Sequence, residues 1–118
     1  MEQNSNKTYD LEERTYEFAL AVCQYCKKLP RTISNSEYVK QVIRSSGSPA
    51  SNYIEANEAL SKKDFQMRIK ICRKEAKETE LWLKLIIKTN PEKFTDEGSL
   101  LMGEAVELKK IFSAILNK

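Results

Sequence analysis

The sequence predicts an all-α fold, an antiparallel up-down-up-down four-helix bundle that forms one domain over residues 1–118. Three observations lead to this class. Four segments repeat apolar residues at alternating spacings of four and three, which is the heptad pattern of packed helices. Only three Gly and three Pro occur, too few for an all-β fold with many tight turns. The segments are joined by short loops, which place consecutive helices side by side and antiparallel.

The stretch from Ser61 to Thr89 carries the strongest helical signal. It contains neither Gly nor Pro, and it is rich in Lys, Glu, Leu and Ala, which favour helix by propensity. Ser61 followed by Asp64 is a capping box, so we expect the helix to begin after Ser61 and to end before Asn90. Its core-facing stripe consists of Phe65, Ile69, Cys72, Ala76, Thr79, Leu83 and Ile86.

The first and last helices have the same pattern. We expect the first from Asp10 to Leu29, with Asp10 and Glu13 as its capping signal and the following proline as its stop. Its stripe is Leu11, Thr15, Phe18, Val22, Tyr25 and Leu29. We expect the last helix from Asp96 or Ser99 to Leu116. Its stripe is Leu101, Ala105, Leu108, Phe112 and Ile115.

The second helical segment contains a conflict. Ser34 and Glu37 suggest a capping box at its start. Its apolar phase continues through Val39, Val42, Ser46, Pro49, Tyr53, Ala56 and Leu60. The middle, however, is S-S-G-S-P-A-S, a cluster typical of loops. The segment is either two helices or one kinked helix, and the unbroken phase favours the kinked helix. We expect Asn52 and Glu55 to bond its backbone or a neighbouring helix. Residues 1–8 are polar, and we expect them to be disordered.

The helix over 61–89 has a second stripe beside its core face, which includes Glu75 and Glu78. A two-faced helix does not need this stripe, so it indicates a second contact, either with a neighbouring helix or with another subunit. We expect a homo-oligomer interface at its apolar members and the adjacent leucine, which are Ile71, Leu81, Trp82 and Leu85.

The third face of the same helix is basic. Seven basic residues lie between positions 62 and 77, against only Asp64 and Glu75. We hypothesise that this face binds the phosphates of RNA or DNA through Lys63, Lys70, Arg73, Lys74, Lys77 and Lys84. The alternative is a solvated face whose lysines pair with Glu75, Glu78 and Glu80.

The sequence argues against catalysis and against a cofactor or metal site. It has no His, the commonest general base and metal ligand. Cys23, Cys26 and Cys72 lack the partners of a zinc site, and we expect reduced, mostly buried thiols. No P-loop or dinucleotide motif occurs. No apolar run approaches a membrane span and no secretory signal opens the chain, so we expect a cytoplasmic protein that does not contact a membrane.

Five linked motifs resemble a known family. They are Y-D-L-E-E-R-T-Y-E-F-A (9–19), C-K-K-L-P (26–30), R-S-S-G-S-P-A-S-N-Y-I-E-A (44–56), S-K-K-D-F (61–65) and K-E-A-K-E-T-E-L-W-L (74–83). Together they resemble the bacterial four-helix-bundle proteins encoded in intervening sequences of 23S ribosomal RNA genes. Many members have Val-Gly where this chain has Pro49 and Ala50, so we expect the kink to be a local variant.

The resemblance implies an antiparallel bundle that assembles into a ring-shaped homopentamer. The family also includes accessory proteins of diversity-generating retroelements, which bind nucleic acid and a reverse transcriptase. The leading hypothesis is therefore a non-catalytic homo-oligomeric module that binds nucleic acid. The second is a homo-oligomeric scaffold for another protein, and an enzyme ranks last.

Overall fold

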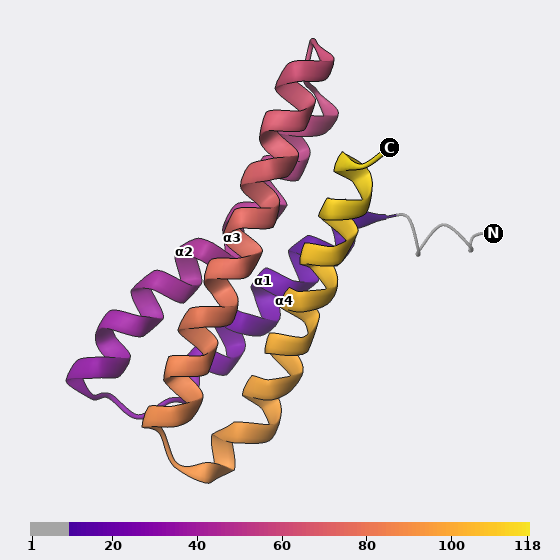
Figure 1. Ribbon diagram of the computed structural model, residues 1–118. Helices are drawn as coiled ribbons and strands as arrows, with labels where there is room; N and C mark the ends of the chain where they lie inside the picture. Colours follow the sequence, from indigo (N-terminus) through magenta and orange to yellow (C-terminus); the bar gives the residue numbers. More distant parts are fainter. Residues whose placement is uncertain (1–9) are drawn as a thin grey trace, which may run out of the picture.

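The computed structural model describes residues 10–118, which form four α-helices and one short 3-10 helix. These are α1 (Leu11–Lys27), α2 (Ile33–Asn57), α3 (Lys62–Thr89), η2 (Glu92–Phe94) and α4 (Thr95–Leu116). Within this range there is no strand, so the all-α class is confirmed. The chain runs alternately down and up through the four helices (Figure 1). The expected disorder of residues 1–8 concerns a segment outside the described residues.

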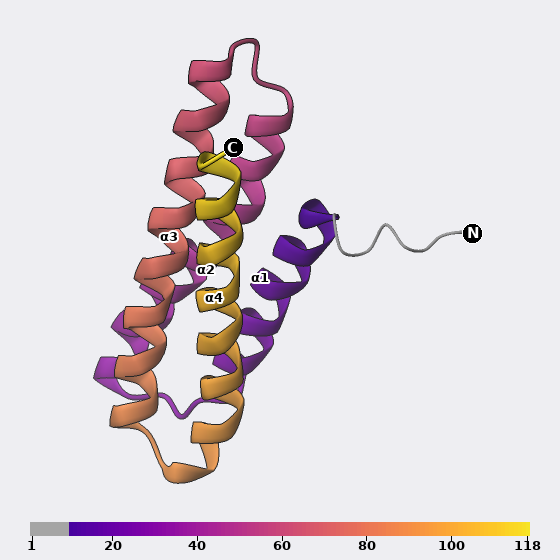
Figure 2. The same ribbon diagram turned by 45° about the vertical axis from the view of Figure 1, so that its right-hand side comes forward.

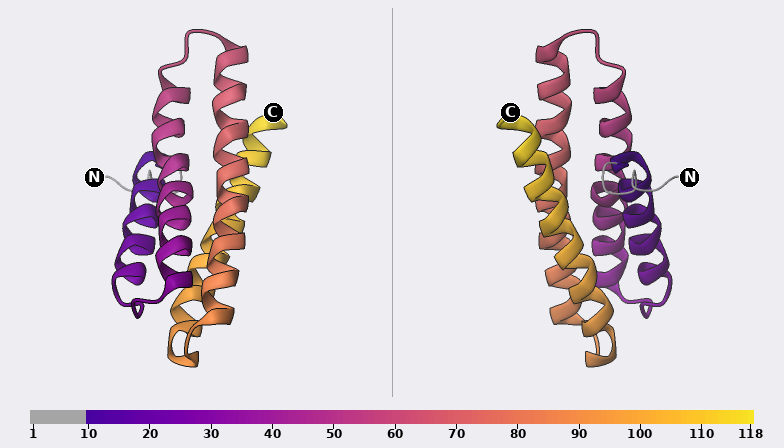
Figure 3. Two further views of the ribbon diagram at one scale, coloured as in Figure 1. Left: turned by 90° about the vertical axis from the view of Figure 1, so that its left-hand side faces the viewer. Right: turned by 90° about the vertical axis from the view of Figure 1, so that its right-hand side faces the viewer.

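Neighbouring helices pack against one another as in a bundle. Consecutive helices are in contact, α1 also touches α4, and the most extensive contacts are those of α3 with α2 and with α4. The α2–α3 hairpin extends beyond the ends of α1 and α4, as two further orientations show (Figures 2 and 3). The molecule therefore measures 44 × 33 × 20 Å, with one end closed by all four helices and the other formed by the hairpin alone.

The predicted stripes form the core. On α3 every predicted stripe residue is buried except Phe65, which is half-buried near the open end. On α4 the stripe is buried up to Phe112, and Ile115 is half-buried. The stripe of α1 is buried along its whole length, including Leu29 just beyond the helix end. Burial of these apolar surfaces is the main force that holds the helices together.

The helix starts follow the caps that the sequence predicts, with one exception. The carboxylate of Asp10 accepts from the backbone N–H of Glu13 at 3.0 Å, and the hydroxyl of Ser61 accepts from that of Asp64 at 3.0 Å. The predicted cap at Ser34 is wrong. The extended residue at this start is Thr32, whose hydroxyl accepts from Asn35 N–H at 3.0 Å. Ser34 therefore already lies inside the first turn.

α2 is one continuous helix through Pro49, and it changes direction near its middle (Figure 1). Proline has no N–H, so the carbonyl of Ser45 loses its usual helical donor. Asn52 supports this segment, because its amide donates to the Ser48 carbonyl at 3.1 Å and its oxygen accepts from Arg68 of α3 at 3.0 Å. The continuous helix and the expected role of Asn52 are both confirmed. The same role is not confirmed for Glu55, whose side chain is exposed.

One predicted core residue is exposed. α2 ends at Asn57, so Leu60 falls in the turn before α3 and is 99% exposed. The apolar spacing continued to Leu60, but a periodic pattern places a residue in the core only while the helix itself continues. The prediction for Leu60 is therefore wrong.

The closed end is fixed by contacts between distant segments. The side-chain amides of Asn35 and Asn90 donate to each other at 2.7 and 2.8 Å, and Tyr25 Oη donates to the Phe94 carbonyl at 2.9 Å. Gly98 packs so closely that an added Cβ would lie 2.6 Å from Tyr25 Oη. These contacts join the start of α2 to the end of α3, and the end of α1 to the start of α4.

Candidate nucleic-acid interface

The second stripe of α3 faces α2 of the same chain. Arg44 of α2 donates to Glu75 at 3.4 Å and to Glu78 at 3.2 Å. Trp82 packs against the core beside Tyr38 of α2, with 6.2 Å between the ring centroids. The sequence left open whether this stripe contacts a neighbouring helix or another subunit. For Glu75, Glu78 and Trp82 the contact is with the neighbouring helix α2.

The remaining acid of the predicted pairing faces α4. Glu80 accepts from Lys109 at 2.7 Å. The expected pairing of the α3 lysines with Glu75, Glu78 and Glu80 is therefore wrong, because Arg44 of α2 and Lys109 of α4 occupy those carboxylates. The reason is geometric, since these acids lie on the flanks of α3 that face its neighbours. A basic face that is simply solvated stays the alternative to nucleic-acid binding.

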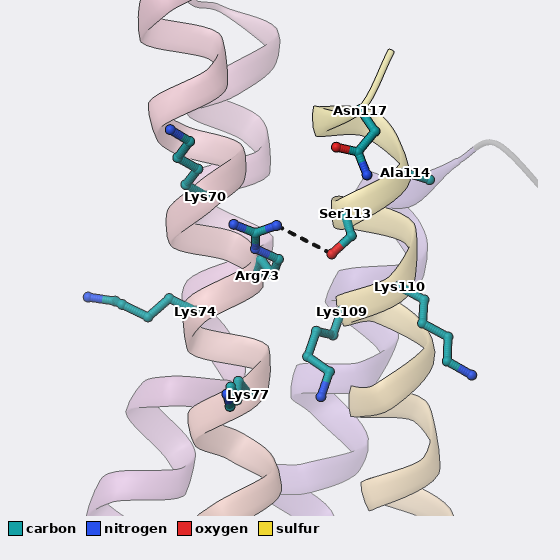
Figure 4. A pocket seen from close by; sticks show the side chains of 9 residues that line it. All are labelled: Lys70, Arg73, Lys74, Lys77, Lys109, Lys110, Ser113, Ala114 and Asn117. Carbon is teal, nitrogen blue, oxygen red and sulfur yellow. Dashed lines mark hydrogen bonds between the residues drawn. The ribbon is translucent and has the colours of Figure 1, made fainter.

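An open groove of about 720 Å³ runs between α3 and α4. α3 contributes four cations and α4 contributes two more. Its lining is Lys70, Arg73, Lys74, Lys77, Lys109, Lys110, Ser113, Ala114 and Asn117. Arg73 and Lys109 lie between the two helices, whereas Lys74 and Lys110 point outward from either side (Figure 4). Arg73 also donates to the Ser113 hydroxyl at 3.4 Å.

A second groove of about 550 Å³ shares Lys77 with the first and continues toward the closed end. It is lined by Lys77, Glu80, Leu81, Lys84, Ile87, Lys88, Thr95, Ser99 and Met102. We call the two grooves together the α3/α4 seam. With a rise of about 1.5 Å per residue, the stretch of α3 from Lys70 to Lys88 gives the seam a length of roughly 27 Å.

The seam is strongly basic. Lys109 is paired with Glu80, and Lys110 lies 3.6 Å from Glu107. Its other six cations form no salt bridge with any residue between 10 and 118; they are Lys70, Arg73, Lys74, Lys77, Lys84 and Lys88. A row of cations without acid partners creates a positive potential that attracts polyanions.

Five of the six residues that the sequence predicted for nucleic-acid binding line the seam. The exception is Lys63, which lies in the first turn of α3, beyond the grooves. Sequence reasoning missed Lys109 and Lys110 because it treated the basic face as a property of one helix. The signal was present as a Lys-Lys pair near the end of α4, but only packing places it opposite α3.

The predicted oligomer residues differ in exposure. Leu81 is 49% exposed and lines the seam, whereas Ile71, Trp82 and Leu85 are half-buried. The contact of Trp82 with Tyr38 occupies part of this surface within the chain. An interface between copies at these residues stays a prediction.

An apolar cleft of about 940 Å³ lies at the open end, where the hairpin extends past the end of α4. Residues of all four helices contribute. It is lined by Leu11, Arg14, Tyr53, Lys62, Phe65, Gln66, Glu107, Ile111, Ala114, Ile115, Leu116 and Lys118. This cleft is another concave surface that could accept a partner.

The cysteines are poorly suited to nucleophilic chemistry. Burial raises the pKa of the Cys26 and Cys72 thiols to about 12, so the reactive thiolate is suppressed at neutral pH. Among residues 10–118 no group of three or more His, Cys, Asp or Glu side chains could hold a metal ion. None of the helices described in that range has the length and apolar character needed to span a bilayer.

The fold and sequence also agree with known proteins. A family model described as "23S rRNA-intervening sequence protein" matches residues 7–114. The chain belongs to this family. The predicted resemblance is thereby confirmed.

A solved relative of this intervening sequence protein has the same fold. It is a protein of unknown function from the S23 ribosomal protein family of Bacteroides thetaiotaomicron. The two are 29% identical, with a TM-score of 0.78, and the match covers 91% of this chain and 98% of the relative. No curated protein matches the chain. The family has no established activity, so the argument for function rests on the surfaces described above.

Proposed function

We propose that this intervening sequence protein is a non-catalytic, homo-oligomeric helical module that binds RNA or DNA along the α3/α4 seam. The observation that supports the proposal most is the row of six cations that form no salt bridge within residues 10–118. Lysine is a flexible point charge that binds phosphate without demanding a fixed geometry. Binding through such contacts is largely independent of base sequence.

The proposed mechanism is electrostatic. Each phosphate that a lysine neutralises releases condensed counterions, so affinity falls steeply as salt rises. The net charge of one chain is only +3. An oligomer repeats the seam on every subunit, so one long nucleic acid can contact several copies and gain avidity without new contacts.

The test is charge reversal within the seam. We expect the triple variant Lys70→Glu, Arg73→Glu, Lys77→Glu to bind RNA and DNA at least a hundredfold more weakly at ~50 mM salt, with a flatter dependence on salt. Fluorescence anisotropy at several salt concentrations measures both quantities. Sedimentation confirms that the oligomeric state of the variant is unchanged.

The matched control carries the same charge change elsewhere. Lys27→Glu, Arg31→Glu, Lys40→Glu alters three exposed cations that lie outside the seam. If this control loses as much affinity as the seam variant, net charge and not the seam governs binding. If the wild-type protein binds neither RNA nor DNA at ~50 mM salt, where phosphate contacts are strongest, the nucleic-acid proposal fails.

The proposed assembly rests on exposed apolar side chains. Leu60, Ile33 and Leu100 are 99%, 90% and 78% exposed, and Leu81 is 49% exposed. Each of these side chains is a candidate for a contact between copies, and the family resemblance makes a pentamer the specific expectation. Sedimentation equilibrium tests it, and a 13.6 kDa monomer at micromolar concentration would contradict the assembly.

A second candidate function is that of a homo-oligomeric scaffold for another protein. The apolar cleft at the open end favours it, because a cleft lined by Leu11, Phe65 and Ile111 offers the kind of surface that protein partners bury. In this case the seam variant would bind its protein partner as well as the wild type does. The absence of nucleic-acid binding by the wild type would favour this candidate.

A further inference from the structure

We infer that the nucleic acid bound along the α3/α4 seam is double-stranded. The inference rests on the proposed function and adds the class of ligand. Three features of the seam support it, namely the chemistry of its lining, the density of its charge and its rigid, elongated frame.

The lining offers many contacts to phosphates and no aromatic ring on which a base could stack. Its side chains are cationic, acidic, small and polar, or aliphatic, and no described residue that lines it is aromatic. The two aromatic rings of α3 lie outside the seam, since Trp82 packs beside Tyr38 and Phe65 lines the cleft at the open end. Proteins that hold single strands commonly stack each base on a ring, which contributes about 1–3 kcal/mol per base. The seam lacks this contribution.

A site that recognises charge alone favours the ligand with the densest charge. A duplex carries one phosphate charge per about 1.7 Å of its axis, counting both strands. Counterion release is also larger for a duplex, with a slope of about −0.9 per neutralised phosphate against about −0.7 for a single strand. The same six unpaired cations therefore gain more free energy from a duplex than from a single strand.

The frame of the seam acts in the same direction. Two packed helices hold its cations on a rigid, elongated frame, with Lys70, Lys74 and Lys77 along α3 and Lys109 and Lys110 along α4. The seam matches roughly eight base pairs at about 3.4 Å per pair. A duplex is already straight over this length, because its persistence length is about 50 nm. A single strand must lose conformational freedom to follow the seam.

The experiment compares ligands of equal length. A labelled 20-base-pair RNA duplex, the corresponding DNA duplex, oligo-U and oligo-dT are titrated with the full-length protein at ~50 mM salt, the low-salt regime in which phosphate contacts are strongest. We expect at least one duplex to bind ten times more tightly than either single strand. Equal or tighter binding of the single strands overturns this inference and leaves the proposed function in place. Failure of all four ligands to bind overturns the proposed function itself.

A gain-of-function variant tests the reason for the preference. Ala114 is exposed and lines the seam, so Ala114→Trp introduces a ring without removing a cation. We expect single-strand affinity to rise about fivefold or more while duplex affinity changes little. Gln24→Trp on the exposed surface of α1, outside the seam, is the matched control, because it also leaves the charge unchanged, and we expect it to change neither affinity. A single-strand affinity that Ala114→Trp leaves unchanged contradicts the argument from the lining.

Discussion

The charged side chains on the two flanks of α3 differ in whether they form salt bridges. On the flank that faces α2, Glu75 and Glu78 accept from Arg44. On the flank that faces α4, six seam cations form no salt bridge within residues 10–118. The flanks belong to one helix with one heptad phase. The difference shows that the neighbouring helix decides whether a charge is used for structure or remains available to a ligand.

Burial explains why the two flanks differ. The side chain of Glu75 is 8% exposed, and a charge removed from water to that degree requires a partner. The lysines of the seam reach past the backbone to solvent and therefore require none. The carboxylate of Glu75 at the edge of the core therefore needs an ion-pair partner. The solvated lysines of the seam can do without one at little cost in folding free energy.

The largest expected effect comes from breaking the close packing between α3 and α4. In Gly98→Ala the new Cβ would lie 2.7 Å from Ile87 Cγ1 and 2.6 Å from Tyr25 Oη. We expect the free energy of unfolding to fall by about 2 kcal/mol, as measured by urea denaturation. Gly103→Ala is the control, because nothing lies within 4 Å of its added Cβ. That variant should be more stable than the wild type by about 0.5–1 kcal/mol, and a loss in both variants would contradict the packing argument.

The flank that faces α2 also carries a buried thiol, and this gives a prediction for pH. Burial raises the pKa of Cys72 from 9.0 to about 12, so the unfolded chain loses this proton before the native protein does. The native state binds more protons between pH 9 and pH 12, and stability should therefore fall across that window. We expect Cys72 to account for part of this loss. Urea denaturation should show a smaller decline in Cys72→Ala, and an identical decline would contradict the assignment.

The ion pairs of α2 provide a smaller contrast. Arg44→Ala leaves Glu75 and Glu78 without their shared partner, but the arginine is 54% exposed and solvent screens the pairs. We expect a loss of about 1 kcal/mol in the free energy of unfolding. Lys77→Ala removes a seam cation and should change stability by less than about 0.5 kcal/mol. Thermal unfolding compares the stability of the two variants. An equal loss of stability in both would contradict the claim that only the flank facing α2 uses its charges for structure.

A further variant should combine a small loss of stability with a gain in nucleic-acid binding. Glu80→Gln releases Lys109 from its ion pair at 2.7 Å and removes the only acid that lines the described seam. We expect nucleic-acid affinity to rise several-fold at ~50 mM salt with a steeper salt dependence, while stability falls by less than about 1 kcal/mol. Glu92→Gln removes an exposed acid outside the seam and is the control. A similar gain in nucleic-acid affinity in Glu92→Gln would show that net charge, and not the seam, causes the effect.

Much of the fold could be predicted because its signals are local. The caps at Asp10 and Ser61 depend on residues three positions apart, and the core stripes depend on a spacing within one helix. Local signals also failed in two places. Thr32, and not Ser34, caps the start of α2. The helix also ends before Leu60, although the apolar spacing continues to that residue.

The sequence by itself thus determined four helices, their core faces and a basic face on α3. Only the tertiary structure decided which charges remain available, because the partners of Glu75, Glu78 and Glu80 come from helices about 30 residues away in the chain. The same packing brought Lys109 and Lys110 to the α3 cations and completed the seam. A heptad spacing specifies which face of a helix is buried, whereas the pairing of charges depends on how neighbouring helices are rotated and aligned against each other.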